Sequence, residues 1–126
     1  MRVVDTSAWV EWTLGSALGR SLSGELPTKD RWVVPTIVQF ELARWAARAS
    51  TAQVAEGIAA FASKCVVAPL FTPIAMHAAA LARRHSLAAA DSIVLATAVE
   101  YGADLLTCDA HFKGLPNVAY FERRLH

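Results

Sequence analysis

Apolar residues are arranged along the chain in two alternating patterns. Short continuous runs rich in valine and leucine are typical of buried strands in a parallel sheet, and apolar residues that recur every three or four positions are typical of helices. The runs predict strands over residues 2–5, 31–34, 65–70, 104–107 and 117–121. The longer pattern predicts a helix after the first strand, further helices over about 36–49, 51–63, 73–85 and 88–101, and a weaker helical segment around Leu18 and Leu22.

Residues that favour the ends of helices and strands agree with this division. Thr6 or Ser7 can cap the helix after the first strand, and Ser50 or Thr51 can cap the helix that precedes the third strand. Pro69 confines the third strand to an edge of the sheet or places the proline at the end of the strand. Strands that alternate with helices through short connections predict an α/β fold, with a mostly parallel sheet of about five strands covered by helices on both faces.

Composition adds four expectations. The 126 residues fit a single domain over residues 1–126. Hydrophobic residues make up 55% and the mean hydropathy is +0.34, so we expect a partner or a second copy to cover some apolar surface. Cys65 and Cys108 are expected to pack as small hydrophobic residues.

The sequence shows neither a signal peptide nor an apolar run of about 20 residues, which predicts a cytoplasmic protein without a membrane span. The net charge of +1 argues neither for nor against nucleic acid.

Four acidic residues stand where surface charges are uncommon. Asp5 ends the first predicted strand and Asp109 follows the fourth, so both carboxylates would emerge at the same edge of a parallel sheet. Glu41 shares a helical stripe with apolar residues four positions away on either side. Asp91 shares a stripe with apolar residues four and seven positions later. Each of these acids is therefore expected to point inward.

Each acid taken alone also has a simpler structural explanation. Asp5 or Asp109 could cap a helix, and Glu41 could pair with Arg44 on a solvated face of its own helix. An isolated carboxylate such as Asp91 is costly to bury in an alanine-rich helical face. Asp91 could act as a cap only if its helix began later than predicted.

Taken together, the four acids favour a metal site at the carboxyl ends of the strands. Carboxylates gathered at one edge would repel one another unless a cation neutralised them. A set of oxygen ligands without cysteine or a required histidine suits Mg²⁺ or Mn²⁺ rather than Zn²⁺, and these ions act on phosphate groups. Thr6, Ser7 and Thr107 lie beside the acids in the sequence, where their hydroxyls could orient carboxylates or simply serve as caps and strand ends.

The sequence resembles PIN-domain ribonucleases, and in particular the small VapC-type toxins, over essentially the whole chain. The stretch "VVDTSAWVEW" matches the first motif and contains Asp5, and "VVPTIVQFELARWA" matches the second and contains Glu41. The stretch "LAAADSIVLATAVEYGADLLTCDAHFKGLPNV" matches the last block and contains Asp91 and Asp109. The chain departs from the family at Ser92, where many relatives carry alanine.

This resemblance implies a three-layer α/β/α sandwich and a divalent-metal-dependent endoribonuclease that hydrolyses RNA phosphodiester bonds. It also implies a homodimer and a co-produced VapB-type antitoxin that neutralises the toxin. On this hypothesis Asp5 and Asp91 contact the metal most directly. Asp109 completes the site directly or through water, and Glu41 adds to the ligands or helps to orient and deprotonate the attacking water.

Binding of RNA would require positive charge near the acids, since phosphates supply most nucleic-acid affinity. The candidate RNA contacts are Arg44, Arg48, Arg83 and Arg84. Charge runs of this size are also typical of solvated helix faces. His111, two residues after Asp109, could touch the substrate or could be an exposed loop residue.

Trp9 and Trp12 cannot easily both face one small core along with Leu14. One of the two rings could line a surface where a second copy or an antitoxin docks, because aromatic residues often anchor such contacts. Packing in the core is the alternative.

Two other classes of function account for less of the sequence. A receiver-like signalling module also gathers acids and Mg²⁺ at strand ends, but it normally needs an adjacent acidic pair where this chain has Asp5 alone. Phosphorylation by acetyl phosphate would identify such a module. A catalytically inactive binding subunit would keep the acids only as structural residues, and metal-dependent cleavage would exclude it.

Overall fold

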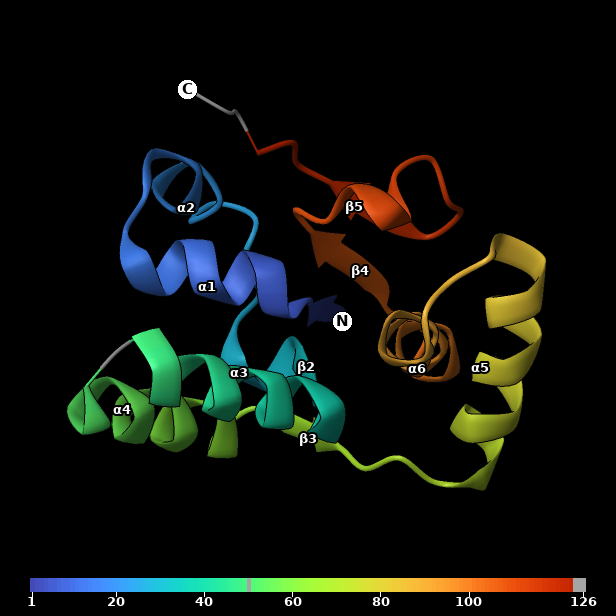
Figure 1. Cartoon of the computed structure of the whole chain (residues 1–126), viewed down its shortest axis with the longest axis horizontal. Coiled ribbons are helices and arrows are strands. Elements are labelled where there is room, and N and C mark those ends of the chain that lie inside the picture. The colour runs from blue at the N-terminus through green and yellow to red at the C-terminus, as the bar shows by residue number, and fades with distance from the viewer. Residues whose placement is uncertain (50, 124–126) are drawn as a thin grey trace.

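The computed structural model describes residues 1–49 and 51–123, within which five parallel strands form one sheet in the order β3-β2-β1-β4-β5. The strands are β1 (Arg2–Val4), β2 (Trp32–Pro35), β3 (Val66–Ala68), β4 (Asp104–Thr107) and β5 (Val118–Tyr120). The helices are α1 (Thr6–Leu14), α2 (Ala17–Ser21), α3 (Thr36–Ala49), α4 (Ala52–Ser63), α5 (Thr72–His85) and α6 (Ala89–Glu100), with short 3₁₀ helices η1 (Lys29–Arg31) and η2 (Ala110–Phe112). Figure 1 shows α1 and α2 on one side of β1 and β4, with α5 and α6 on the other. The predicted α/β/α sandwich is confirmed.

The path of the chain through the sheet places one pair of strand ends at its centre. From β1 the chain moves outward to β2 and β3, and it then returns to the other side of β1 to form β4 and β5. The strand order therefore reverses between β1 and β4, which is where parallel α/β sheets bind their ligands. The apolar strand residues with no exposed surface are Val3, Val4, Val33, Val34, Leu105 and Leu106. Helices on both faces explain why these strands are continuously apolar in the sequence.

The predicted boundaries hold to within two residues, and one predicted helix cap is an exception. Thr51 caps α4, since its side-chain oxygen accepts a hydrogen bond from Val54 N at 3.3 Å. The alternative cap, Ser50, lies outside the described residues. β3 is an edge strand, as Pro69 predicted, but it ends at Ala68 and so is shorter than the predicted strand over residues 65–70.

The exception is the beginning of α1. The predicted cap, Thr6 or Ser7, is wrong, because both residues lie within the first turn of the helix. Asp5 occupies the N-cap position instead, but its side chain makes no capping hydrogen bond. The simple reading of Asp5 as a helix cap is therefore wrong as well, and its carboxylate is free for other contacts.

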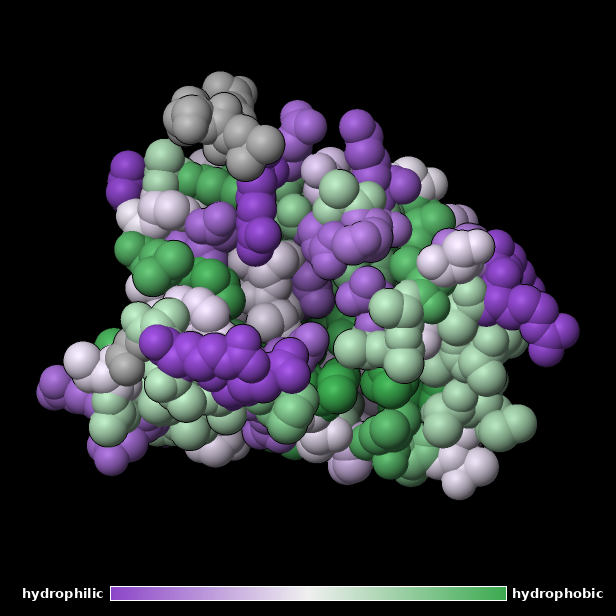
Figure 2. Space-filling view, in the orientation of Figure 1, coloured by the Kyte–Doolittle hydropathy of each residue, from purple (hydrophilic) through white to green (hydrophobic). Residues whose placement is uncertain are grey.

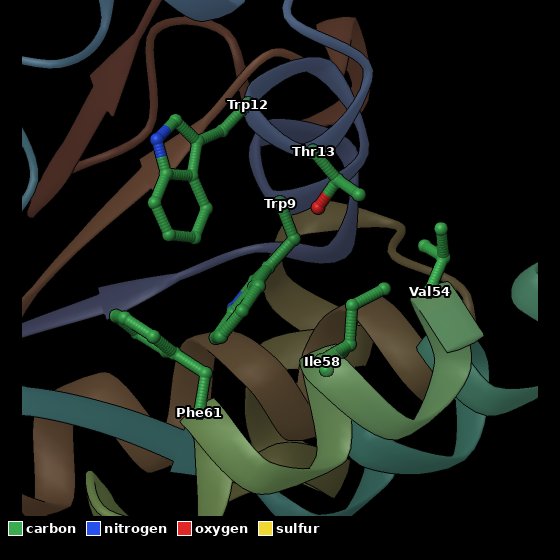
Figure 3. Close-up of a pocket in the computed structure, with 7 residues that line it drawn as sticks. Trp9, Trp12, Thr13, Val54, Ile58 and Phe61 are labelled. Atoms are coloured by element: carbon green, nitrogen blue, oxygen red, sulfur yellow. The ribbon is translucent and has the colours of Figure 1, made fainter.

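Four aromatic rings form a cluster beneath α1. The Trp9 ring, 1% exposed, lies 4.8 Å from the Trp32 ring, 5.9 Å from the Trp12 ring and 5.7 Å from the Phe61 ring between centroids. A hollow of about 330 Å³ opens beside it between α1 and α4, lined by Trp9, Trp12 and Phe61 among others (Figure 3). Leu14 is 62% exposed. Trp9 therefore lies in the core without competition from this leucine, and the partly buried Trp12 packs against the core. A docking role for one of the two rings stays a prediction.

Several large apolar side chains are exposed elsewhere. They are Phe40 on α3, Met76 on α5, and Leu70 and Phe71 before α5. In the space-filling view, hydrophobic residues show between α3 and α5, while hydrophilic residues gather above them near η2 (Figure 2). In the part of the chain that the structure describes, no helix is long and apolar enough to cross a membrane.

Gly19 is required where α2 meets the end of α1. A Cβ atom at this position would overlap the carbonyl oxygen of Glu11, and a main-chain oxygen cannot rotate away. Gly19→Ala should therefore lower the free energy of unfolding by about 1–3 kcal/mol, because the two helices must separate. Urea denaturation followed by circular dichroism measures the change.

The matched control is Gly57→Ala in the middle of α4, where a Cβ atom would meet nothing within 4 Å. This change should raise the free energy of unfolding by about 0.5–1 kcal/mol through helix propensity alone. Equal effects of the two substitutions would contradict the close approach of α1 and α2.

Candidate active site

Asp5 lies directly after β1, where the strand order reverses. Its backbone N–H donates to the carbonyl oxygen of Leu106 on β4 at 2.8 Å, which holds the ends of the two strands together. The residue is only 5% exposed. Its Oδ2 atom accepts hydrogen bonds from Ser7 Oγ at 2.7 Å and from Thr107 Oγ1 at 2.8 Å. Two neutral hydroxyls thus fix the orientation of a buried carboxylate.

The same two hydroxyls connect Asp5 to the segment after β4. Ser7 Oγ accepts a hydrogen bond from Cys108 N at 2.9 Å, and Thr107 Oγ1 accepts one from Asp109 N at 3.0 Å. The backbone that carries Asp109 is therefore held in place by groups that also hold Asp5. Movement of either acid would disturb the other, so the two strand ends form one structural unit.

Glu41 reaches this edge of the sheet from α3. Its Oε1 atom accepts a hydrogen bond from Thr6 Oγ1 at 2.8 Å, so the third predicted hydroxyl also contacts an acid. Among the described residues no ion pair joins Glu41 to Arg44, and that alternative reading is wrong. The Arg44 guanidinium lies over the ring of Phe40, 5.1 Å from its centroid.

Asp91 and Asp109 meet a histidine at the centre of the edge. Asp91 lies in the first turn of α6, and Asp109 begins the turn of η2 after β4. One ligand atom from each of Asp91, Asp109 and His111 lies within 4.8 Å of the other two. Asp109 Oδ1 accepts a hydrogen bond from His111 N at 2.9 Å, and the Nδ1 atom of the His111 ring lies 2.7 Å from the same oxygen. Asp109 therefore caps the η2 turn as predicted. Its other carboxylate oxygen, Oδ2, has no described hydrogen bond and is available to bind a ligand.

The clustered acids perturb one another's ionisation. Burial and, to a smaller extent, the negative charges of Asp109 and Asp5 together raise the pKa of Asp91 to about 6. Burial also raises the pKa of Asp5, against the opposing effect of its hydrogen bonds from Ser7 and Thr107. Asp109 and Glu41 add repulsion to Asp5. All four predicted acids therefore share one electrostatic environment.

These residues fit a hard divalent cation. No described residue donates a hydrogen bond to the Asp91 side chain, and the charges around it are mainly negative. A cation between Asp91 and Asp109 would remove the repulsion that raises the pKa of Asp91. Carboxylate oxygens are the ligands that Mg²⁺ and Mn²⁺ prefer. Asp5 lies at the same edge but is not one of the three residues whose ligand atoms lie within 4.8 Å of one another.

The predicted RNA contacts lie outside this cluster. Arg48 is exposed in the last turn of α3. Arg83 and Arg84 are exposed at the end of α5, where they line a shallow hollow with Ala80. Within residues 1–49 and 51–123, none of the four candidate arginines forms an ion pair with the four acids. Their role stays a prediction.

Two residues near the site, His111 and Arg123, were not among its predicted members. His111 was left open as a loop residue, although its position two residues after Asp109 was a usable signal. Arg123 comes from the segment after β5, where its Nε atom lies 3.3 Å from Glu11 Oε1 on α1. Its guanidinium also donates to the carbonyl oxygen of Ser7 at 3.5 Å. Nothing in the sequence around Arg123 indicates that the chain returns to α1.

Comparison with known proteins gives one family and a consistent set of structures. The family model described as the PIN domain matches residues 2–118. No curated protein sequence matches the chain.

Several solved structures share the fold. A toxin–antitoxin complex from Klebsiella pneumoniae matches with 21% identity and a TM-score of 0.84, over 98% of this chain and 100% of that one. VapBC2 from Rickettsia felis, bound to a promoter DNA fragment, has 15% identity and a TM-score of 0.75, over 98% of each chain. VapC20 from Mycobacterium tuberculosis, described as a toxin that cleaves the sarcin–ricin loop, has 19% identity and a TM-score of 0.74, over 94% of this chain and 97% of that one.

Proposed function

The chain belongs to the PIN domain family, and from this membership we propose that it is a divalent-metal-dependent endoribonuclease, the VapC-type toxin of a toxin–antitoxin pair. The observation that carries the proposal is the approach of Asp91 to Asp109 at the point where the strand order reverses, with Asp5 near enough for its charge to raise the pKa of Asp91. Structural caps and solvated helix faces do not require these three carboxylates to approach one another. A shared substrate site does.

We assign the acids separate tasks in RNA hydrolysis. Asp5, Asp91 and Asp109 would hold Mg²⁺, or Mn²⁺ in its place. When bound, such an ion lowers the pKa of a coordinated water and neutralises charge that develops on the phosphate. Glu41 would accept the proton of the attacking water or orient that water, and the hydrogen bond from Thr6 fixes its carboxylate for this purpose.

The hydroxyls of Ser7 and Thr107 would keep Asp5 in place for the reaction. Both donate to the same oxygen, Oδ2, which leaves Oδ1 as the oxygen without a described hydrogen bond. Such a carboxylate can present one oxygen to a ligand without first giving up a protein contact. A buried acid held in this way costs little reorganisation when charge changes beside it.

The direct test is cleavage of RNA by the purified chain with Mg²⁺, with Mn²⁺ and with EDTA. We expect cleavage with either ion and loss of cleavage, by about 100-fold or more, in the chelator. Restoration on addition of excess Mg²⁺ would show that the chelator had not unfolded the protein. Undiminished cleavage in EDTA would contradict the metal-dependent mechanism, and a chain inactive under every condition would favour a binding subunit.

The partner proposals rest on fold relatives. The similar structures from Klebsiella pneumoniae and Rickettsia felis are a toxin–antitoxin complex and VapBC2, and we infer a VapB-type antitoxin for this chain. We also infer a homodimer, for which the exposed apolar residues of α3 and α5 are a candidate surface. A single PIN domain over residues 1–126 that acts on cellular RNA would work in the cytoplasm. A short overlapping reading frame upstream, encoding a DNA-binding element and a charged tail, is the expected genomic observation.

A further inference from the structure

We propose that His111 supplies a nitrogen ligand to the divalent ion at Asp91 and Asp109, and so gives this site a preference for Mn²⁺ over Mg²⁺. The inference rests on the proposed metal-dependent function and adds a residue to it. Its observation is geometric: the ligand atoms of the three residues lie within 4.8 Å of one another.

The backbone around His111 places the ring at the acids. Phe112, with no exposed surface, anchors the η2 turn in the core. Asp109 caps the same turn, and its Oδ1 atom accepts the hydrogen bond from His111 N at 2.9 Å. The imidazole then projects from a turn that is fixed on both sides, with its Nδ1 atom 2.7 Å from the Asp109 carboxylate. Asp109 and His111 therefore form a pair of potential ligands on one rigid turn.

The ring itself has little structural purpose at this position. The His111 side chain is 78% exposed, and its described polar contact is with Asp109. An exposed pair of this kind adds little to stability. Asp91 lies close by with no described hydrogen-bond donor. The arrangement thus brings together one imidazole and two carboxylates, and these three side chains would hold one divalent ion.

An imidazole nitrogen changes which ion the site prefers. Mg²⁺ is a hard ion that takes oxygen ligands almost exclusively, whereas Mn²⁺ and later first-row ions also accept imidazole. A site of carboxylates alone would discriminate weakly between Mg²⁺ and Mn²⁺. The ratio of the affinity for Mn²⁺ to the affinity for Mg²⁺ should therefore be larger when His111 is a ligand than when the ring is absent.

The test is pulsed electron paramagnetic resonance of Mn²⁺ bound to the full chain in a buffer without nitrogen. We expect nitrogen hyperfine coupling from a directly bound imidazole in the wild type and its loss in His111→Ala. Titration should show that His111→Ala binds Mn²⁺ roughly 10-fold or more weakly, with a smaller change for Mg²⁺. The matched control is His77→Gln, because His77 contacts Glu100 at the opposite end of α6 from Asp91. This variant should keep the coupling.

The outcomes separate the two proposals. Mn²⁺ that binds without nitrogen coupling, in a chain that cleaves RNA, would overturn the role of His111 and leave the nuclease in place. Coupling that survives in His111→Ala would also overturn it. Failure of the wild type to bind any divalent ion, together with cleavage that EDTA leaves unchanged, would overturn both.

Discussion

Asp91→Asn should lower the rate of RNA cleavage by about 10²–10³-fold while making the metal-free protein more stable. The loss follows from the position of Asp91 beside Asp109 at the reversal of strand order. An amide at this position removes one anionic ligand, and stabilisation of phosphate charge by a bound ion contributes several kcal/mol to such reactions. Asparagine has nearly the same shape as aspartate, so the loss would reflect charge rather than packing.

The expected gain in stability of Asp91→Asn arises because the negative charge of Asp91 is unfavourable in the metal-free protein. The pKa of Asp91 is raised from 3.8 to about 6 by burial and by the charges of Asp109 and Asp5. Between these two pH values the native chain holds a proton that the unfolded chain has released, so the stability of the wild type falls as pH rises. The full shift corresponds to about 3 kcal/mol, which partial exposure to solvent reduces to roughly 1–2 kcal/mol. Asp91→Asn removes this cost.

Urea denaturation in EDTA at several pH values measures the effect. The free energies of unfolding of wild type and Asp91→Asn should agree near pH 4 and differ in favour of the variant above pH 6. Added Mg²⁺ should stabilise the wild type more than the variant, since ligand that binds only the folded state shifts its stability. A variant that is less stable at neutral pH, or one that cleaves RNA normally, would contradict the assignment.

Asp104→Asn is the control with the opposite sign. Asp104 begins β4, and the hydrogen bonds from Arg2, at 2.9 and 2.8 Å, hold the pKa of its carboxyl below the ordinary value. Replacement of the Asp104 carboxylate by an amide should lower the free energy of unfolding by up to about 1 kcal/mol. The rate of RNA cleavage should stay the same. Two aspartates in one small protein would then respond to the same substitution in opposite directions.

The arrangement of the fold could be predicted because its strands are buried on both faces. Val3 and Val4 on β1, and Leu105 and Leu106 on β4, leave no room for polar residues until the strands end. Asp5 and Asp109 directly follow these two strands or lie just beyond them, and parallel pairing of β1 with β4 brings the two strand ends together. This reasoning locates the site without any knowledge of side-chain contacts.

The side-chain contacts within the site could not be predicted from the spacing of apolar residues, because they depend on strand register and on the exact ends of helices. The choice of Ser7 and Thr107 as partners of Asp5 follows from the exact register of β1 and β4, in which Val4 pairs with Leu106. The prediction of Thr6 or Ser7 as the cap of α1 failed because the helix begins at Thr6, directly after Asp5, which periodicity alone does not locate to a single residue. His111 was left undecided because an exposed histidine in a loop is unremarkable until the loop is seen to face two carboxylates.

Trp9→Ala should be the most destabilising of the substitutions considered, by about 3–5 kcal/mol. Trp9 is 1% exposed and contacts three other aromatic rings. Because its removal would extend the adjoining hollow of about 330 Å³, the loss of contacts cannot be repaired by collapse of nearby side chains. A loss of this size is a large part of the 5–15 kcal/mol that typically holds a small domain together. Urea denaturation followed by far-ultraviolet circular dichroism measures it without relying on tryptophan emission.

Two further variants distinguish packing from other roles of this cluster. The indole nitrogen of Trp9 is buried without a hydrogen-bond partner among the described residues, so Trp9→Phe keeps most of the ring and removes an unsatisfied donor. It should cost less than about 1.5 kcal/mol. Trp12 is only partly buried, and Trp12→Ala should cost an intermediate amount if the ring serves the core. Unchanged melting of Trp12→Ala combined with lost antitoxin binding would instead identify this ring as part of a docking surface, and equal costs for Trp9→Ala and Trp9→Phe would contradict the packing argument.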